Sequence, residues 1–574
     1  MERSECDSPF SLANETFRWI EKNLRDEIDF VLWTGDSARH DNDEEIPRQE
    51  WEIFRLNELM VSKFVEVFGV DEEPDDTRLT IPIVPTFGNN DMLPHNIFRP
   101  GPNTWTRKFV DIWDRFIPEE QRHAFVQGGW FTAEVIPGKL AAISLNTMYF
   151  FDSNNAVDGC YAKSEPGYEH MEWLRVQLER LRERDMKAIL IGHVPPARSS
   201  NKISWEESCW QKYTLWVHQF RDIIVGSVYG HMNIDHFMLQ DSRDLEIAGF
   251  DHDEDDDDDE EEGEEEEKEA AESEDQDASI TSRSSYLSSL RRQWSKLPSP
   301  PEDIGGDGDE FVPDEFDRPL DTGKEREDKG KFLKRIGGPF AERYSVSLVS
   351  PSVVPNYFPT LRVMEYNITG LEDTATWRDV RSVESSSSDE VVESGKKQKK
   401  NNKKKKKKGR PPSFTYPKPP SKTALPGPAY SNQALSLLSY RQYYANLTRI
   451  NDAYAKSKKH NGFDYEVEYD TKVDRVYKLK DLTVRSFFKL ASRLADGALT
   501  KNDESISSIE EEASMDDSRN EAYETHDDNE EAEDQAKRGK KGKKRGKKKN
   551  RAWVTFLYRA FVGNIGTTGE EDAV

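Results

Sequence analysis

Three runs of like charge divide this chain of 574 residues, and they exclude a single compact globule. Residues 251–277 hold 20 Asp and Glu against one Lys, while residues 396–410 and 537–551 each hold 11 Lys and Arg and no acidic residue. Such runs repel themselves and offer little apolar surface to bury, so we expect them to be disordered. Folded structure must therefore come from the segments between them.

The longest such segment, residues 7–250, has the pattern of an α/β region. Apolar residues recur at helical spacing over 11–27 and 168–184, between short apolar runs typical of buried strands. Those runs are 28–33, 81–87, 140–145, 188–191 and 223–229. Helices alternating with buried strands indicate a sheet whose faces are covered by helices.

Shorter segments with folding patterns follow the acidic run. Residues 345–354 and 361–366 resemble a strand pair, 432–454 and 482–494 have helical patterns, and 465–477 alternate as in a strand. The apolar segment 553–562 is predicted to dock back on the core. The division we predict is a core at 1–250, an acidic disordered insertion at 251–340, a core continuation at 341–371, a Ser/Lys/Pro-rich linker at 372–428, a core part at 429–496, a charged linker at 497–551 and a docking segment at 552–574.

Residues suited to metal binding follow four of the predicted strands, each within three residues of a glycine. A single Gly-Asp or Gly-His after a strand is more often turn chemistry, but the ordered set is far more specific. Ligands of open α/β sheets gather at the carboxyl ends of the strands, so these side chains are expected to converge on an ion such as Zn²⁺ or Mn²⁺. They are Asp36 after 31–35, Asn89 and Asn90 after 83–87, His193 after 189–191, and His231 with Asn233 after 225–229.

This ordered set resembles the calcineurin-like metallophosphoesterases. Within them it is most similar to the fungal vacuolar endopolyphosphatases, a branch related to acid sphingomyelinase. The closer similarity is carried by Trp33–Asp43, Phe87–Asn96, Gly230–Phe237, Ser350–Val363 and Arg559–Gly563. The resemblance implies an α/β sandwich of two central β-sheets flanked by helices, interrupted by long disordered charged insertions. It also implies hydrolysis of phosphoanhydride bonds inside inorganic polyphosphate.

The resemblance further implies two divalent metal ions, of Mn²⁺, Zn²⁺, Co²⁺ or Mg²⁺, with Asp36 bridging both. Asn89, His193 and His231 would complete one ion site, and Asn233, or His236 in its place, would contribute to the other. Two catalytic residues are implied: His40 as general acid, and Asn90, which stands where most relatives have a histidine and donates only a hydrogen bond. Position alone suggests Arg39 and Arg198 as substrate-binding residues.

The family's Asp-x-His motif lies on a strand before Cys6 and is not in this sequence. We therefore expect the sequence to begin at an internal methionine or to be truncated, with the membrane anchor also missing. The chain as written has no run of 18 apolar residues and no signal-peptide pattern. Three cysteines leave at least one unpaired within the chain. The resemblance implies that Cys6 has lost its partner, which leaves Cys160 and Cys209 as a candidate pair.

By the same resemblance, the catalytic domain would lie in the vacuole lumen, anchored in the vacuolar membrane. Glycosylation is then expected at Asn14, Asn367 and Asn446, and vacuolar proteases are candidate partners. Two other functions stay open: a sphingomyelinase-like phosphodiesterase, and a non-catalytic polyanion-binding protein that has lost its first metal. No specific nucleic-acid binding is expected, because no base-reading module is present and the chain outside the three runs is strongly acidic.

Overall fold

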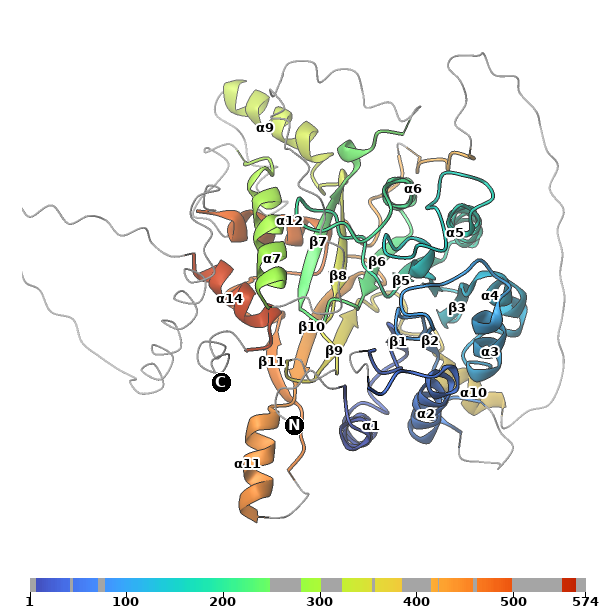
Figure 1. Cartoon of the computed structure of the whole chain (residues 1–574). Helices are drawn as coiled ribbons and strands as arrows, with labels where there is room; N and C mark the ends of the chain where they lie inside the picture. The colour runs from blue at the N-terminus through green and yellow to red at the C-terminus, as the bar shows by residue number, and fades with distance from the viewer. Residues whose placement is uncertain are drawn as a thin grey trace, which may run out of the picture.

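The computed structural model (Figure 1) describes residues 7–41, 45–70, 78–247, 280–300, 323–353, 357–384, 414–421, 423–457, 462–497 and 550–563. The predicted disorder of the three charged runs falls outside these residues, except at Asn550 and Arg551. Asn550 caps a helix that begins at Arg551, so that helix starts one residue before the predicted docking segment.

The core is a six-stranded mixed sheet with the order β3-β4-β5-β6-β8-β7. The four central strands are parallel, and β3 and β7 run antiparallel at the two edges. Every residue of β4 is buried, as expected for a strand covered on both faces. The strands are β3 (Phe131–Ile136), β4 (Leu140–Ser144), β5 (Lys187–Ile191), β6 (Ile224–Tyr229), β7 (His236–Asp241) and β8 (Tyr344–Val349).

Two smaller sheets accompany the core, so the described residues form three hydrogen-bonded sheets rather than the two implied by resemblance. β1 (Val31–Trp33) and β2 (Ile83–Pro85) pair in parallel, and the Ser144 hydroxyl of β4 donates to the Pro85 carbonyl over 2.7 Å. β10 (Leu437–Tyr444) lies between β9 (Thr360–Tyr366) and β11 (Glu466–Asp470), antiparallel to both. The predicted α/β class is confirmed, while β1, expected to be buried, is only half-buried.

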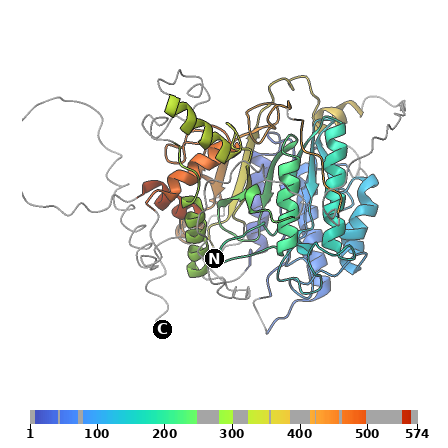
Figure 2. The same cartoon turned by 90° about the horizontal axis from the view of Figure 1, so that it is seen from above.

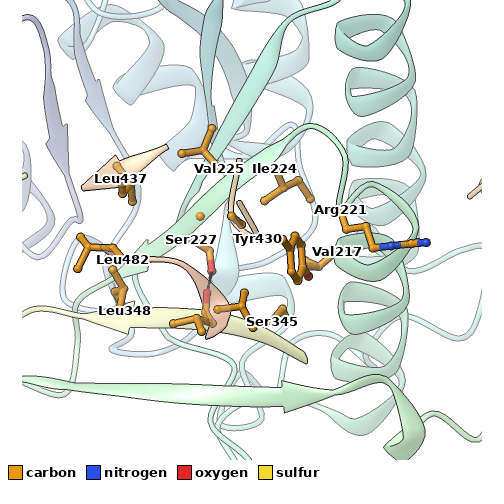
Figure 3. Close-up of a pocket in the computed structure, with 14 residues that line it drawn as sticks. Val217, Arg221, Ile224, Val225, Ser227, Ser345, Leu348, Tyr430, Leu437 and Leu482 are labelled. Atoms are coloured by element: carbon orange, nitrogen blue, oxygen red, sulfur yellow. Dashed lines mark hydrogen bonds between the residues drawn. The ribbon is translucent and has the colours of Figure 1, made fainter. Parts of the chain in front are cut away.

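The three-stranded sheet packs toward the core sheet at Gly226 of β6. A Cβ at Gly226 would lie 3.3 Å from the Leu437 side chain of β10, so a larger residue there would press on β10. A largely apolar cavity of about 30 Å³ remains beside this contact, with Val225 and Leu482 among its walls (Figure 3). Its volume holds about one water molecule and its lining is mostly apolar, so it is a packing defect rather than a ligand site.

Up to residue 247, the described residues form six α-helices. Trp216 of α6 donates its indole N–H to the Met171 carbonyl of α5 over 2.8 Å, which joins these two helices. The candidate pair Cys160 and Cys209 forms a disulfide that ties the loop before α5 to α6. The helices are α1 (Phe10–Asn23), α2 (Glu50–Phe68), α3 (Thr104–Ile112), α4 (Arg122–Gly128), α5 (Pro166–Glu183) and α6 (Glu207–Gln219).

The described residues of the predicted insertion at 251–340 form two helices, α7 (Ile280–Ser295) and α9 (Gly323–Ile336), so ordered structure resumes well before residue 341. Tyr286, Leu290 and Trp294 recur every four residues on α7 and are buried, and Trp294 stacks on Phe237 of β7 at 4.8 Å. The predicted linker at 372–428 likewise begins with α10 (Trp377–Glu384). Apolar residues at helical spacing therefore order segments whose overall composition is polar.

Two expectations for the later segments are wrong. β8 and β9 do not pair with each other, because β8 inserts between β6 and β7 while β9 pairs with β10. Residues 432–454 are not one helix but strand β10 followed by α11 (Leu447–Ser457). The expected helix at 482–494 is α12 (Val484–Ala495), and α14 (Arg551–Ala560) carries the apolar segment near the end of the chain.

Figures 1 and 2 show α12 beside α7 and α14, on the side of the molecule away from the blue N-terminal helices. Trp553, Phe556 and Leu557 of α14 are buried there, so this helix is part of the core. Within the described ranges, we find no helix that combines the length and the apolar character needed to cross a membrane.

One buried side chain makes the fold sensitive to acid. His170 of α5 is stacked between the Trp130 and Phe150 rings, with centroid distances of 4.5 and 4.8 Å. Neither of its ring nitrogens has a hydrogen-bond partner among the described residues. Burial therefore lowers the pKa of His170 to about 3 from an ordinary value of 6.5. The folded chain keeps this ring neutral, whereas the unfolded chain protonates it below pH 6.5, so stability is lost as the pH falls from 6.5 toward 3.

We expect His170→Phe to stabilise the protein by about 2 kcal/mol more at pH 5 than at pH 8, since each pKa unit corresponds to roughly 1.4 kcal/mol. Phenylalanine preserves the aromatic stack and removes both unpartnered nitrogens. Urea unfolding at the two pH values measures the difference. The exposed His123→Gln is the matched control and should change stability by less than about 0.5 kcal/mol. A gain for His170→Phe that is equal at both pH values would contradict this account.

Candidate metal centre

The loop after β1 turns sharply and presents Asp36. Gly35 and Asp36 both have left-handed backbone conformations, with φ of 88° and 60°. The Asp36 carboxylate accepts hydrogen bonds from the backbone N–H of Asn90 (2.9 Å) and from its side-chain amide (3.0 Å). A Cβ at Gly88 would lie 2.0 Å from Asp36 Oδ1, so only glycine allows this approach.

Asp91 holds that loop in place, a role that sequence reasoning missed. Its buried carboxylate accepts the backbone N–H groups of Asp36, Ser37 and Ala38 over 2.9–3.2 Å. It also accepts the N–H of Gly88 and the side-chain amide of Asn57, each over 3.0 Å. The acidic residue after Gly-Asn-Asn was the available signal, but the loop that it holds, Asp36 to Ala38, lies 53 to 55 residues earlier in the chain.

Four side chains from four strand ends converge. Ligand atoms of Asp36, His193 and His231 lie within 4.8 Å of one another. Asn89 Oδ1 lies 2.9 Å from both His193 Nε2 and His231 Nδ1. These residues follow β1, β2, β5 and β6, and the structure brings the four side chains together at one end of these strands.

The donor set fits a cation. His193 Nδ1 donates to the Thr34 carbonyl over 2.7 Å, which leaves Nε2 directed at Asp36 Oδ2, 3.1 Å away, and at Asn89 Oδ1. Burial raises the pKa of Asp36, but His193 lowers it more, so the carboxyl is held below its ordinary pKa. A carboxylate, an amide oxygen and two imidazoles directed inward are ligands of a borderline divalent ion. The described residues thus offer a complete donor set for one ion.

Asn90 and His40 occupy different positions around this centre. The Asn90 amide is bonded to Asp36, so it orients that carboxylate. His40 Nδ1 lies 2.5 Å from Asp7 Oδ1, and its backbone N–H donates to Asp7 Oδ2 over 2.9 Å. Burial lowers the pKa of His40, but the hydrogen bond to Asp7 and the charge of Asp36 raise it more, so the net shift is upward. Asp7 was not predicted from the sequence.

Arg48 is a second residue that sequence reasoning missed. Its side chain is fully buried and lies 3.8 Å from the Asp41 carboxylate. It donates to the carbonyls of Asn90 (2.7 Å) and Arg39 (2.9 Å). These hydrogen bonds from the guanidinium therefore link the loop that carries His40 to the loop that carries Asn89 and Asn90.

The remaining predicted residues lie outside the converging group. Asn233 belongs to the same loop as His231, with φ of 55°, but no side-chain hydrogen bond joins it to the group among the described residues. His236 does not replace it, because its ring contacts the Tyr286 hydroxyl of α7 at 3.1 Å. Arg39 is paired with Glu52 at 2.7 Å, and Arg198 with Glu207 at 3.0 Å, so both guanidinium groups are already engaged by carboxylates.

The three predicted glycosylation residues are half-buried rather than fully exposed. Asn14 lies within α1, and the Thr16 of its acceptor motif is buried against the Tyr465 hydroxyl at 3.0 Å. Asn367 donates to Asn432 over 2.7 Å, and Asn446 accepts from the Arg449 backbone N–H at the start of α11. Glycosylation at these residues stays a prediction.

We expect Asp7→Asn to move the alkaline limit of the kcat/KM profile to lower pH. The neutral side chain no longer favours protonated His40, so the pKa of His40 falls and fewer molecules carry the proton that a general acid must donate. The profile is to be measured with a substrate that has a poor leaving group. A substrate with a good leaving group should be less affected, and the exposed Asp26→Asn is the control. An unchanged limit for Asp7→Asn would exclude His40 as the acid.

Comparison with known proteins agrees with this geometry. A family described as "Calcineurin-like phosphoesterase" matches residues 8–233. A Neurospora crassa protein named "Endopolyphosphatase" is 42% identical over 551 residues, which cover 86% of this chain and 72% of the relative. The Saccharomyces cerevisiae protein of the same name is 36% identical over 538 residues, covering 86% and 76%. The Schizosaccharomyces pombe protein is 36% identical over 500 residues, covering 86% and 74%. The chain therefore belongs to the endopolyphosphatase family of calcineurin-like phosphoesterases.

Proposed function

We propose that this chain hydrolyses phosphoanhydride bonds inside inorganic polyphosphate and releases shorter chains. The observation that carries the proposal is the convergence of Asp36, Asn89, His193 and His231 at four strand ends. This constellation occurs in a chain whose relatives are named for that activity. The four side chains would hold a divalent ion, of which Zn²⁺ and Mn²⁺ suit the mixed oxygen and nitrogen donors best.

When bound, such an ion supplies Lewis-acid activation of water and of the phosphoryl group. The chain's own residues supply the rest. Asn90 and Asp91 hold Asp36 and its loop rigid, and Arg48 fixes the Asn90 backbone beside them. His40, whose protonated form Asp7 favours, is the candidate donor of a proton to the leaving phosphate oxygen. Asn90 cannot donate that proton, because a side-chain amide does not ionise in water near neutral pH.

A second ion, which Asp36 would help to hold, is part of the proposal through the family resemblance. So are the vacuole lumen as the location, the membrane anchor, and vacuolar proteases as partners. The disulfide between Cys160 and Cys209 supports an oxidising compartment, since such bonds persist outside reducing cytosol. The three asparagines of the acceptor motifs would then be available for glycosylation.

The test uses purified chain stripped of metal, with Mn²⁺, Zn²⁺, Co²⁺ or Mg²⁺ added back and long-chain polyphosphate as substrate. We expect a ladder of intermediate lengths on a gel, metal-dependent and abolished by His231→Gln, while the exposed His123→Gln retains it. Cleavage of sphingomyelin instead would favour the phosphodiesterase alternative. Polyphosphate binding without any cleavage, under every metal, would favour the non-catalytic alternative and overturn the proposal.

A further inference from the structure

Asn89 is the one candidate ligand with a side-chain amide. The oxygen and the NH₂ group of that amide differ chemically but are nearly identical in size and shape. Its Oδ1 is directed at His193 and His231, each 2.9 Å away. A rotation of the amide by 180° would instead direct the NH₂ group at the centre. That group is a hydrogen-bond donor with no lone pair to offer, so an ion would lose a ligand. Something must therefore set the orientation of this amide.

Two side chains on the far side of Asn89 do so. The Asn89 Nδ2 group lies 2.8 Å from His95 Nε2 and 3.0 Å from Asn96 Oδ1. In the tautomer with the ring proton on Nδ1, His95 accepts at Nε2 as Asn96 does at Oδ1, so each amide hydrogen has its own acceptor. In the flipped orientation, the Asn89 oxygen would face the oxygen of Asn96, which repels it. The pair therefore selects the orientation in which Oδ1 faces the two imidazoles.

The backbone holds these two acceptors in position. Asn96 has φ of 65°, a left-handed conformation that costs most residues about 1 kcal/mol or more and that asparagine tolerates better. The Asn96 N–H donates to the carbonyl of Asn89 over 3.3 Å and closes a loop of eight residues, 89–96. This loop returns the chain so that residues six and seven positions after Asn89 contact its side chain.

We propose that His95 and Asn96 are positioning residues that lock the Asn89 amide with its oxygen toward the bound ion and thereby set the affinity of the centre. Their catalytic consequence rests on the proposed function, but their effect on ion binding does not. Partners that orient a metal ligand typically contribute 10- to 100-fold in affinity or activity. The two residues act through Asn89, and sequence reasoning had assigned neither of them a role.

Calorimetric binding of Mn²⁺ to the metal-stripped chain tests this directly. Asn96→Gly suits the positive φ but removes the acceptor, so we expect the Kd to rise about 10-fold or more. Asn96→Asp keeps an acceptor oxygen at the same place and should recover most of that affinity. His95→Leu should weaken binding to a similar degree and His95→Gln less, with the exposed His123→Leu as control. Melting temperatures are measured for every variant.

Several results would overturn the inference. Equal losses in Asn96→Gly and Asn96→Asp would show that the backbone, not the acceptor, matters. An unchanged Kd in Asn96→Gly and His95→Leu with a lower kcat would assign them to substrate contact instead. Absence of Mn²⁺, Zn²⁺ and Co²⁺ binding in the wild-type chain would also refute it. By contrast, wild-type chain that binds Mn²⁺ but does not cut polyphosphate would refute the proposed function alone, and the binding comparison would still decide this inference.

Discussion

Replacing Asp36 by Asn is expected to lower kcat/KM for polyphosphate roughly 1000-fold or more and to weaken Mn²⁺ binding in parallel. Asp36 is the only carboxylate among the four converging side chains, and its charge faces His193 at 3.1 Å. A metal ion contributes several kcal/mol of transition-state stabilisation, and each 1.36 kcal/mol corresponds to about a tenfold change in rate. Loss of the one anionic ligand is therefore expected to lower kcat/KM by about three factors of ten or more.

The same substitution should leave the fold intact. Asparagine has nearly the same volume and still accepts the Asn90 backbone N–H, while Asp91 continues to hold the loop from Asp36 to Ala38. Melting temperature and Mn²⁺ calorimetry are measured beside the kinetics, with the exposed Asp158→Asn as the matched control. Retention of more than a tenth of wild-type activity by Asp36→Asn would show that the ion is held elsewhere.

The converging residues were predictable because each follows a strand, and the topology of a parallel sheet brings strand ends to one edge. Asp36, Asn89, His193 and His231 could be found from four short local patterns. Asp7, Arg48 and Asp91 could not, because their roles depend on partners 33 to 55 residues away. No sequence periodicity indicates the role of such residues. That role can be recognised only when the three-dimensional positions of the loops that they connect are known.

The secondary structure divides in a similar way. Strands β4, β5 and β6 were predicted because strands buried on both faces leave continuous apolar runs. β10 was predicted as helix because its Leu and Tyr residues suit either state, and pairing with both β9 and β11 decides for the strand. β8 and β9 are neighbours in sequence, which favours a hairpin. Instead, β8 pairs in parallel with β6 and antiparallel with β7, and no local sequence signal indicates either pairing.

A buried ion pair between residues far apart in the sequence also holds the loop that carries His231. Asp235, four residues after His231, lies 2.6 Å from Arg362 of β9, and both side chains are almost completely buried. The Tyr469 hydroxyl of β11 donates to the same carboxylate, and the Asp235 N–H donates to the Ala560 carbonyl of α14 over 3.1 Å. Asp235 thus links the candidate centre to β9, β11 and the helix near the end of the chain.

We expect Arg362→Met to destabilise the protein by about 3–5 kcal/mol, because it leaves the Asp235 carboxylate buried without its counter-charge. Arg441→Met on the adjacent strand β10 is the matched control. Its partner Asp470 lies 2.8 Å away, but the Arg441 side chain is 45% exposed, so the loss should stay below about 1 kcal/mol.

In the double variant Asp235→Asn with Arg362→Met, the unpaired charge is gone, and much of the lost stability should return. Urea unfolding measures all three. Equal losses for Arg362→Met and Arg441→Met would show that burial of the charge does not decide the cost. A large loss for Arg362→Met that the second substitution reverses would assign the loss to the buried, unpaired charge of Asp235 rather than to lost packing.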